Sequence, residues 1–311
     1  MTPGKRILSV LLTVIMVFSM VPLSVFAADG GAATVITSGG EVAFNVYKDA
    51  VAYANQHDGS TIKLQSDIDV LPYEDPADMP SITGNVTLDL NGKSINCVDV
   101  GSVSFDEEGE IVKDKAGTLT VTGSGSIGLL TMYCGALTLN SGTVEELRAE
   151  DFAVTVHITG GTVESLVLSL RWDDNATADI SGGSVQKLDL GTGTVNITGG
   201  SHGSETAFWG VNGGTLNISG GSFSTLRLFV TSGKIDLTGG EFEYISTDPQ
   251  APFSEYQKLT MGSLLGDSCA FYSKDGSLVS ADVLTLENVK VVADHEHTYK
   301  DGKCTTCGAL C

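Results

Sequence analysis

Basic residues are scarce in this chain: 17 Lys and Arg stand against 38 Asp and Glu, a formal net charge of −21. A surface of that sign disfavours binding to nucleic acid or to anionic membranes, because both require patches of Lys and Arg. Charged residues make up only 18% of the chain, whereas Gly occurs 38 times. Since apolar residues recur in regular positions, this composition is typical of stacked strands and turns rather than of disorder.

Long apolar runs are also lacking, except at residues 7–21. This run follows Lys5 and Arg6 and leads to a small-residue cleavage site at residues 25–27, so a secretory signal peptide is predicted over residues 1–27. An uncleaved anchor is the alternative, but the run is short for a bilayer span. The mature chain would carry 15 basic and 38 acidic residues, a net charge of −23, and would lie outside the cytoplasm, secreted or on the cell surface.

The chain does contain a sequence repeat of about 20 residues, which recurs along most of its length and is built around a Ser/Thr-Gly-Gly turn. The first Gly of that turn, or its equivalent, stands at Gly92, Gly123, Ser141, Gly160, Gly182, Gly199, Gly220 and Gly239. The residues four and two positions before it are apolar, and the residue between them is polar. A period of two is that of a strand. The polar column is Asp89, Thr120, Thr138, His157, Asp179, Asn196, Asn217 and Asp236.

A second strand is predicted after the turn, because apolar residues recur three and six positions beyond it. These pairs are Val144/Leu147, Val163/Leu166, Val185/Leu188, Phe223/Leu226 and Phe242/Ile245. A unit this short cannot bury a core alone and must stack on its copies. Because crossovers between parallel strands are right-handed, the pattern predicts an all-β fold, a right-handed parallel β-helix (β-solenoid). An antiparallel sandwich is the less favoured alternative.

The domain prediction follows from where this pattern starts and stops. A linker without periodicity is expected at residues 28–43, and the β-helix domain at residues 44–294. Within that domain, an apolar stripe at helical spacing predicts an N-terminal capping helix at residues 44–58, with Asn45 as its cap. Residues 247–294, where the pattern breaks, are expected to close the C-terminal end. Residues 295–311 form a small tail rich in Cys and His.

The tail and one insertion offer possible metal ligands. Cys304 and Cys307 form a Cys-x-x-Cys pair, and His297 or His295 could complete a structural Zn²⁺ site. A disulfide among these cysteines and Cys311 is the alternative in an oxidising exterior. The insertion at residues 96–116 is acidic enough for Ca²⁺, although a solvated acidic loop is the commoner explanation. Its acidic cluster is Asp106, Glu107, Glu108 and Glu110.

A binding surface is predicted where the repeat is irregular. Trp172 with Asp173, and Trp209 with His202 and Glu205, fall in two irregular stretches about two coils, or ~10 Å, apart. That spacing is close to the repeat of a β-linked disaccharide, and aromatic rings flanked by carboxylates and an arginine are typical of sugar sites. Arg227 would supply the guanidinium. The alternative is that both indoles pack on the flank of the solenoid.

No convergent catalytic site is predicted. Arg148 and Arg227 would lie four coils apart, about 19 Å, so they cannot act on one sugar. Asp179 and Asp236 would lie three coils apart, about 14 Å, which is too far for either glycosidase geometry. The outward column from Asp179 to Asp236 is instead expected to hydrogen-bond along the solenoid.

Several runs carry a resemblance. Tyr-Lys-Asp-Ala-Val-Ala-Tyr-Ala-Asn at residues 47–55, Val-Thr-Leu-Asp-Leu-Asn-Gly-Lys-Ser-Ile at residues 86–95 and the Cys-x-x-Cys tail resemble secreted pectate-lyase-like β-helix surface proteins of Gram-positive bacteria. That resemblance implies a polysaccharide lyase, a carbohydrate binder or an adhesin. Because no lyase catalytic motif can be matched and no catalytic groups converge, we expect a monomer that binds extracellular polysaccharide or a host or cell-surface glycan, or acts in adhesion, without catalysis. The alternatives are a polysaccharide lyase or glycoside hydrolase acting on acidic polysaccharide, and a structural spacer in a surface layer.

Overall fold

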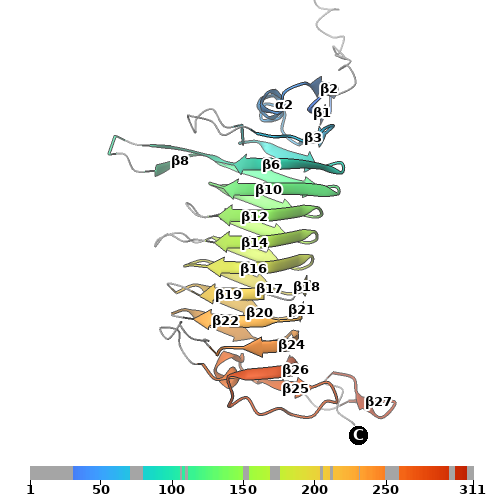
Figure 1. Cartoon of the computed structure of the whole chain (residues 1–311), viewed down its shortest axis with the longest axis vertical. Helices are drawn as coiled ribbons and strands as arrows, with labels where there is room; N and C mark the ends of the chain where they lie inside the picture. Colours follow the sequence, from blue (N-terminus) through green and yellow to red (C-terminus); the bar gives the residue numbers. More distant parts are fainter. Residues whose placement is uncertain are drawn as a thin grey trace, which may run out of the picture.

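The computed structural model describes residues 31–70, 80–105, 107–108, 111–149, 154–168, 176–203, 206–210, 213–230, 232–248, 259–293 and 298–306. Over these residues the chain forms a β-solenoid, an elongated stack of coils in which successive turns of the chain lie on one another (Figure 1). Most coils contribute one strand to each of two sheets, and strands of neighbouring coils pair in parallel. The predicted parallel β-solenoid is therefore confirmed.

The first sheet, called sheet A here, has 11 strands among the described residues. Their order is β2-β1-β3-β5-β9-β11-β13-β15-β17-β20-β23. Their bounds are β1 Ala33–Thr37, β2 Gly40–Phe44, β3 Ser60–Leu64, β5 Asn85–Asp89, β9 Gly117–Thr122, β11 Gly135–Leu139, β13 Val154–Ile158, β15 Thr177–Ile180, β17 Thr194–Ile197, β20 Thr215–Ile218 and β23 Lys234–Leu237.

The second sheet, sheet B, has 13 strands in the same part of the chain, and its main path runs β18-β21-β24-β22-β19-β16-β14-β12-β10-β6-β4. β25 and β26 extend it beyond β24. The bounds are β4 Ser81–Ile82, β6 Lys93–Val100, β10 Gly125–Met132, β12 Thr143–Ala149, β14 Thr162–Leu168, β16 Ser184–Leu190, β18 Ser201–His202, β19 Thr206–Gly210, β21 Ser222–Phe223, β22 Leu226–Val230, β24 Glu241–Ser246, β25 Cys269–Ser273 and β26 Thr285–Ala293.

The Gly-Gly turns let the coils stack closely. At Gly182 a Cβ would collide with the carbonyl oxygen of Thr159 in the coil below. Gly183 has a φ of +67°, and its Cβ would lie 2.6 Å from the carbonyl oxygen of Gly161. A residue with a side chain would therefore be both strained and crowded at the second position. This is why the turn recurs as a pair of glycines.

The apolar columns face inward and form one continuous core along the stack. Leu147, Leu166 and Leu188 are in register on successive strands of sheet B, and each is fully buried. The predicted columns of sheet A are in register from Leu119 to Ile235. In the first coil the prediction was wrong by two residues, because Leu88 pairs with Val121 and not with Leu119. The period of two keeps Leu88 buried despite this shift.

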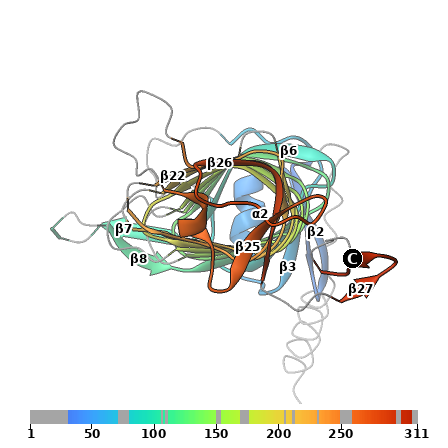
Figure 2. The same cartoon turned by 90° about the horizontal axis from the view of Figure 1, so that it is seen from below.

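The N-terminal end of the stack differs from the predicted linker. β1 and β2 form an antiparallel hairpin, and β1 pairs antiparallel with β3, so most of residues 28–43 belongs to sheet A. The helix α2 spans Tyr47–Ala54, shorter than predicted, and its N-cap is Val46, which makes no side-chain cap hydrogen bond. Its apolar face is buried in the core, and the helix lies within the outline of the coils seen along the stack (Figure 2).

The long insertion begins later than predicted, since β6 continues to Val100. Beyond it, β7 (Ser102–Phe105) and β8 (Ile111–Lys115) form an antiparallel hairpin that projects from the side of the stack (Figure 1). Cys134 lies beneath the base of this hairpin, where its thiol donates to the carbonyl oxygens of Ser102 and Lys115. Cys134 is fully buried.

The C-terminal end closes with antiparallel strands. β26 pairs antiparallel with β24 and with β25, and the 3-10 helix η2 (Met261–Leu264) inserts two apolar side chains into the end of the core. A small hairpin of β27 (Tyr299–Lys300) and β28 (Lys303–Cys304) follows. None of the helices in the described ranges is long and apolar enough to cross a membrane.

Candidate functional site

His202 lies inside the solenoid and not on its surface. The side chain is 1% exposed and occupies the inward column that Val185 occupies one coil earlier. The N–H of Val185 donates to Nδ1 of His202 at 3.3 Å, and Nε2 donates to the carbonyl oxygen of Gly199 at 3.1 Å. Burial lowers the pKa of the imidazole, so the ring is held neutral. A ligand on the flank does not reach it.

Two other predicted residues, Trp209 and Arg227, lie on neighbouring strands of sheet B. β19 and β22 are neighbours, with Ala207 opposite Arg227 and Trp209 opposite Phe229. Arg227 is exposed and has no ion pair within the described residues. Trp172, Asp173 and Glu205 lie outside the described residues. The predicted sugar site therefore stays a prediction, without His202.

The structure describes only some of the predicted metal ligands. Cys304 is 4% exposed on β28, whereas His295, His297 and Cys307 lie outside the described residues. In the insertion, Glu107 and Glu108 are exposed, and Asp106 and Glu110 lie outside the described residues. No group of three or more potential metal-binding His, Cys, Asp or Glu residues occurs within the described ranges.

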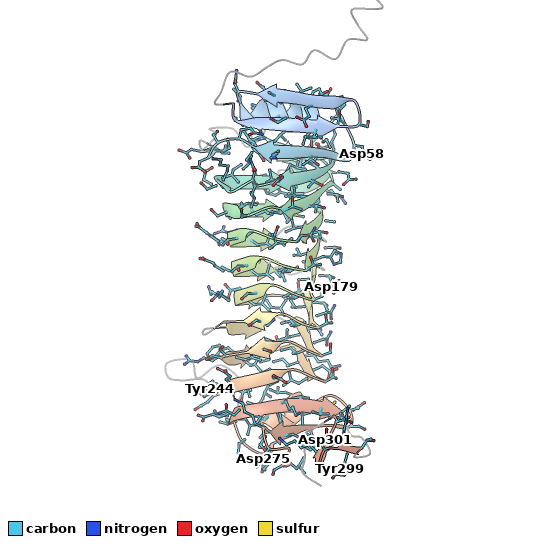
Figure 3. The ribbon with its side chains drawn as sticks, turned by 90° about the vertical axis from the view of Figure 1, so that its right-hand side faces the viewer. Asp58, Asp179, Tyr244, Asp275, Tyr299 and Asp301 are labelled. Carbon is cyan, nitrogen blue, oxygen red and sulfur yellow. The ribbon has the colours of Figure 1, made fainter. Side chains whose placement is uncertain are left out.

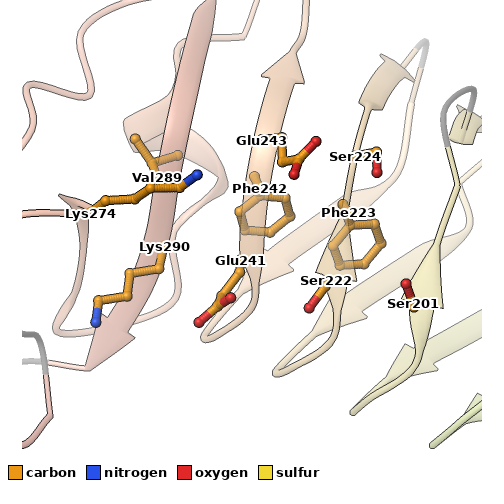
Figure 4. A pocket seen from close by; sticks show the side chains of 10 residues that line it. All are labelled: Ser201, Ser222, Phe223, Ser224, Glu241, Phe242, Glu243, Lys274, Val289 and Lys290. Carbon is orange, nitrogen blue, oxygen red and sulfur yellow. The ribbon is translucent and has the colours of Figure 1, made fainter.

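A groove that was not predicted from the sequence opens on the flank near the C-terminal end, across the last strands of sheet B (Figure 4). Its volume is about 370 Å³, within the usual range of ligand sites. The lining residues come from β18, β21, β24 and β26 and from the segment after β25. They are Ser201, Ser222, Phe223, Ser224, Glu241, Phe242, Glu243, Lys274, Val289 and Lys290.

The groove brings two carboxylates and two ammonium groups to one place. Glu241 and Glu243 are exposed on β24, because Phe242 between them points into the core. Lys290 lies opposite Glu241 in the antiparallel pairing of β24 with β26. Its Nζ donates to the carbonyl oxygen of Thr306 at 3.5 Å. Lys274 adds a second ammonium group on the same side. The lining is thus balanced in charge although the whole chain is strongly acidic.

An aromatic stack supports the floor of this groove. The rings of His202 and Phe223 stack with centroids 4.6 Å apart, and those of Phe223 and Phe242 with centroids 5.1 Å apart. Ser201 and Ser222 immediately precede His202 and Phe223, and their backbones pair in register. Because the stack fixes three successive coils, it also fixes the spacing of the serines at the groove, about 4.8 Å per coil.

The outward polar column of sheet A forms a hydrogen-bonded ladder from Asp179 to Asn217, as predicted, whereas Asp236 at the predicted end of the ladder lies 3.6 Å from Nζ of Lys234. The amide of Asn196 donates to Asp179 at 2.8 Å, and the amide of Asn217 donates to Asn196 at 2.8 Å. His157 lies 3.4 Å from the other carboxylate oxygen of Asp179. Side chains of this column are half-buried between their neighbours in the stack. The column therefore stiffens the sheet, as expected.

A second buried ionisable group lies near the N-terminal end. Asp99 on β6 is 3% exposed, and burial raises the pKa of its carboxyl to about 6, although a hydrogen bond with Thr131 acts in the opposite sense. Burial and the nearby Asp99 raise the pKa of the Cys97 thiol to about 11. The hydroxyl of Tyr47 is buried close by without a hydrogen-bond partner in the described structure. We regard this cluster as structural, because α2 and the first coils enclose it.

Comparison of the chain with models of protein families, with curated proteins and with solved structures gave no match. The predicted kinship with pectate-lyase-like proteins of Gram-positive bacteria therefore rests on the sequence motifs and the solenoid architecture. Function has to be argued from the groove and from the surfaces of the two sheets.

Proposed function

We propose that the protein is a secreted or cell-surface β-solenoid that binds polysaccharide or a surface glycan without catalysis. The observation that carries this proposal is the groove across β18, β21, β24 and β26, where serine hydroxyls, two glutamates and two lysines line a space of about 370 Å³. Saccharides are rich in hydroxyls, and sites that bind them combine hydrogen-bonding side chains with ring faces. Secretion rests on the predicted signal peptide at residues 1–27.

The charges of the groove favour particular glycans. The net charge of the chain is strongly negative, so long-range forces oppose the approach of polyanions. Within the groove, however, Glu241 and Glu243 can accept hydrogen bonds from amino or hydroxyl groups, while Lys274 and Lys290 can donate to a carboxylate. A glycan that carries both kinds of group fits this lining better than a purely acidic or an uncharged one.

Binding is favoured over hydrolysis by the placement of the carboxylates. A glycosidase needs two carboxyl groups that flank the scissile bond. Glu241 and Glu243 both belong to β24 and so stand in one row, whereas the neighbouring row carries Lys290, with Lys274 beside it (Figure 4). We therefore expect no new reducing ends and no unsaturated products when the protein is incubated with acidic or neutral polysaccharides, with or without Ca²⁺.

The test compares two double variants on a glycan array and by calorimetry with the glycans that bind. Glu243→Gln with Lys274→Met alters the groove, and Glu164→Gln with Lys113→Met makes the same change of charge at exposed positions elsewhere. We expect the groove variant to lose affinity by about tenfold or more, as for loss of a hydrogen-bonded charged contact, and the control to match the parent. Equal affinity of all three proteins would show that the groove is not the binding site.

A further inference from the structure

The outer surface of sheet A is unusual in that one kind of side chain repeats along it. In the six coils from β9 to β20, three parallel columns of residues face outward, and most of their members are Thr, Ser or Asn. The first column is Thr118, Ala136, Thr155, Thr177, Thr194 and Thr215. The second is Thr120, Thr138, His157, Asp179, Asn196 and Asn217. The third is Thr122, Asn140, Thr159, Ser181, Thr198 and Ser219.

This surface, which we call the threonine face, carries almost no charge. Asp179 is its only carboxylate, and that group already accepts a hydrogen bond from Asn196 and faces His157. The chain as a whole has 38 acidic residues. Carboxylates are therefore scarce on this face of an otherwise acidic protein. Exposed strand positions do carry them elsewhere, as at Glu145 and Glu164 on sheet B.

The three columns differ in how their polar groups are used. The second column bonds to itself along the stack. In the third, the hydroxyls of Thr159 and Thr198 donate to backbone carbonyl oxygens of the coil below. In the first column, by contrast, the hydroxyls of Thr155, Thr177, Thr194 and Thr215 have no hydrogen-bond partner among the described residues. A row of free hydroxyls thus runs beside two rows that are held in place.

The free row is rigid and evenly spaced. Threonine is β-branched and has few rotamers on a strand, so little conformational entropy is lost when its hydroxyl binds a ligand. Successive coils place these hydroxyls ~4.8 Å apart along the stack, so two coils advance ~10 Å. That advance is close to the length of two sugar residues in an extended β-linked polymer. Six coils span roughly 24 Å, or about five sugar residues.

We propose that the threonine face is a second binding surface, distinct from the groove, which holds an extended, neutral, β-linked polysaccharide along the axis of the stack. The hydroxyls of the first column exchange hydrogen bonds with the sugar hydroxyls, and the threonine methyl groups contact the sugar rings. The scarcity of charge on this face matches the neutrality of the polymer. A second copy of the chain is a poorer occupant, because two strongly acidic molecules repel each other and the face lacks the aromatic residues that anchor protein interfaces.

The experiment measures binding of β-1,4-linked glucose oligomers of two to six residues by calorimetry, and retention of the protein on insoluble cellulose. Affinity should rise with each added sugar up to about five residues and then level off, because longer chains extend past the sixth coil. The α-1,4-linked oligomers of the same lengths, which do not extend, should bind at least tenfold more weakly.

The variant Thr177→Val with Thr194→Val removes two free hydroxyls but keeps the branched shape of the side chains. Its control is Thr143→Val with Thr162→Val, a change of the same kind on neighbouring strands of sheet B. We expect at least a tenfold loss of affinity for the longest β-linked oligomer in the first variant and none in the second. Thr194→Lys, which places a charge on the face, should abolish retention on cellulose, and its thermal unfolding shows whether the solenoid stays intact.

Three results would overturn the proposal: affinity independent of oligomer length, equal losses in the two valine variants, or a dimer in sedimentation that the face variants dissociate. The groove variant Glu243→Gln with Lys274→Met should leave binding to β-glucose oligomers unchanged. Failure of the threonine face and failure of the groove are therefore read from different variants and different ligands.

Discussion

The two sheets of this solenoid share every coil, yet they differ in regularity. From β3 to β23, sheet A repeats the same short strand in continuous parallel register, with a hydrogen-bonded column on its outer side. Sheet B carries the buried Asp99, the buried His202, the short strands β18 and β21 and the antiparallel end. Side chains drawn along the stack form even rows, with Asp179 among them (Figure 3).

The difference indicates where a solenoid accommodates change. Each strand of sheet A is followed by a Gly-Gly turn that leads into sheet B and fixes the register of the strand. An extra residue in a strand of sheet A would therefore turn its apolar side chains outward. Sheet B is followed by the long connections, where residues can be added without disturbing the next turn. Sheet B therefore accommodates buried polar groups and a groove, whereas sheet A stays uniform enough to offer a repeating surface.

The largest effect should come from breaking the aromatic stack of sheet B. Phe223→Ala removes a fully buried ring that contacts both His202 and Phe242, so we expect the free energy of unfolding to fall by about 3–5 kcal/mol. Chemical denaturation measures it. Ser222→Ala, one residue earlier and exposed, is the control and should change stability by less than about 0.5 kcal/mol. A loss below about 1 kcal/mol for Phe223→Ala would mean that the stack does not hold these coils together.

Asp99→Asn should stabilise the protein at neutral pH. The carboxyl of Asp99 has a pKa of about 6 in the fold and an ordinary value of 3.8 when exposed. The folded protein thus binds a proton at Asp99 more tightly than the unfolded chain does. The stabilisation that results is present below pH 3.8 and is lost as the pH rises through 6. We expect a gain of up to about 3 kcal/mol at pH 8. Unfolding curves at pH 4 and pH 8 should be closer together in the variant than in the parent. A variant less stable at pH 8 would contradict this account.

His202 should make the stability of the protein depend on pH in the opposite sense. Burial lowers the pKa of its imidazole below the ordinary 6.5. The unfolded chain therefore takes up a proton first, and stability falls as the pH drops from 6.5 toward the lower folded pKa. His202→Phe, made in the Asp99→Asn background to remove the competing effect, keeps the ring stack and should lack this loss. Denaturation between pH 7 and pH 5 tests it. If both proteins lose stability equally, another group is responsible.

The smallest effect should be seen on sheet A. Asn196→Ala removes two hydrogen bonds of the outer column, to Asp179 and Asn217, and should lower the free energy of unfolding by about 1–2 kcal/mol. Thr194→Val on the same strand removes a hydroxyl without a partner in the described structure and should be close to neutral. If the two substitutions were equally harmless, the hydrogen-bonded column would not contribute to the rigidity of sheet A.

Most of the solenoid could be predicted from the sequence because its register is local. Each turn fixes the strands on both sides, so columns such as Val144 and Val163 could be aligned from spacing alone, and the structure pairs them. The first coil was predicted wrongly because β5 is followed by a longer turn through Asn91 and Gly92, and the anchor no longer marks the same place in the coil. The hairpin of β1 and β2 was missed because its strands pair antiparallel at the end of the sheet.

The groove could not be predicted in the same way. It needs Lys290 to lie opposite Glu241, and that pairing is antiparallel and joins residues far apart in the chain. His202, by contrast, had a signal that was overlooked: it stands three residues after the anchor Gly199, where the other coils have Val185 or Phe223. The place of His202 in an otherwise apolar column indicated that its side chain is buried. This signal was stronger than the nearness of Glu205 and Trp209 in the sequence, which suggested a ligand site.

The stacking of coils also has a consequence for how this protein could change over generations. Each coil touches chiefly the coils above and below it, so a whole coil can be duplicated or deleted by one recombination event without redesigning the rest. The ends, where α2 and β26 cover the core, would stay as they are. The length of the solenoid could then change during evolution in steps of one coil. Chains of different lengths would share the same two ends.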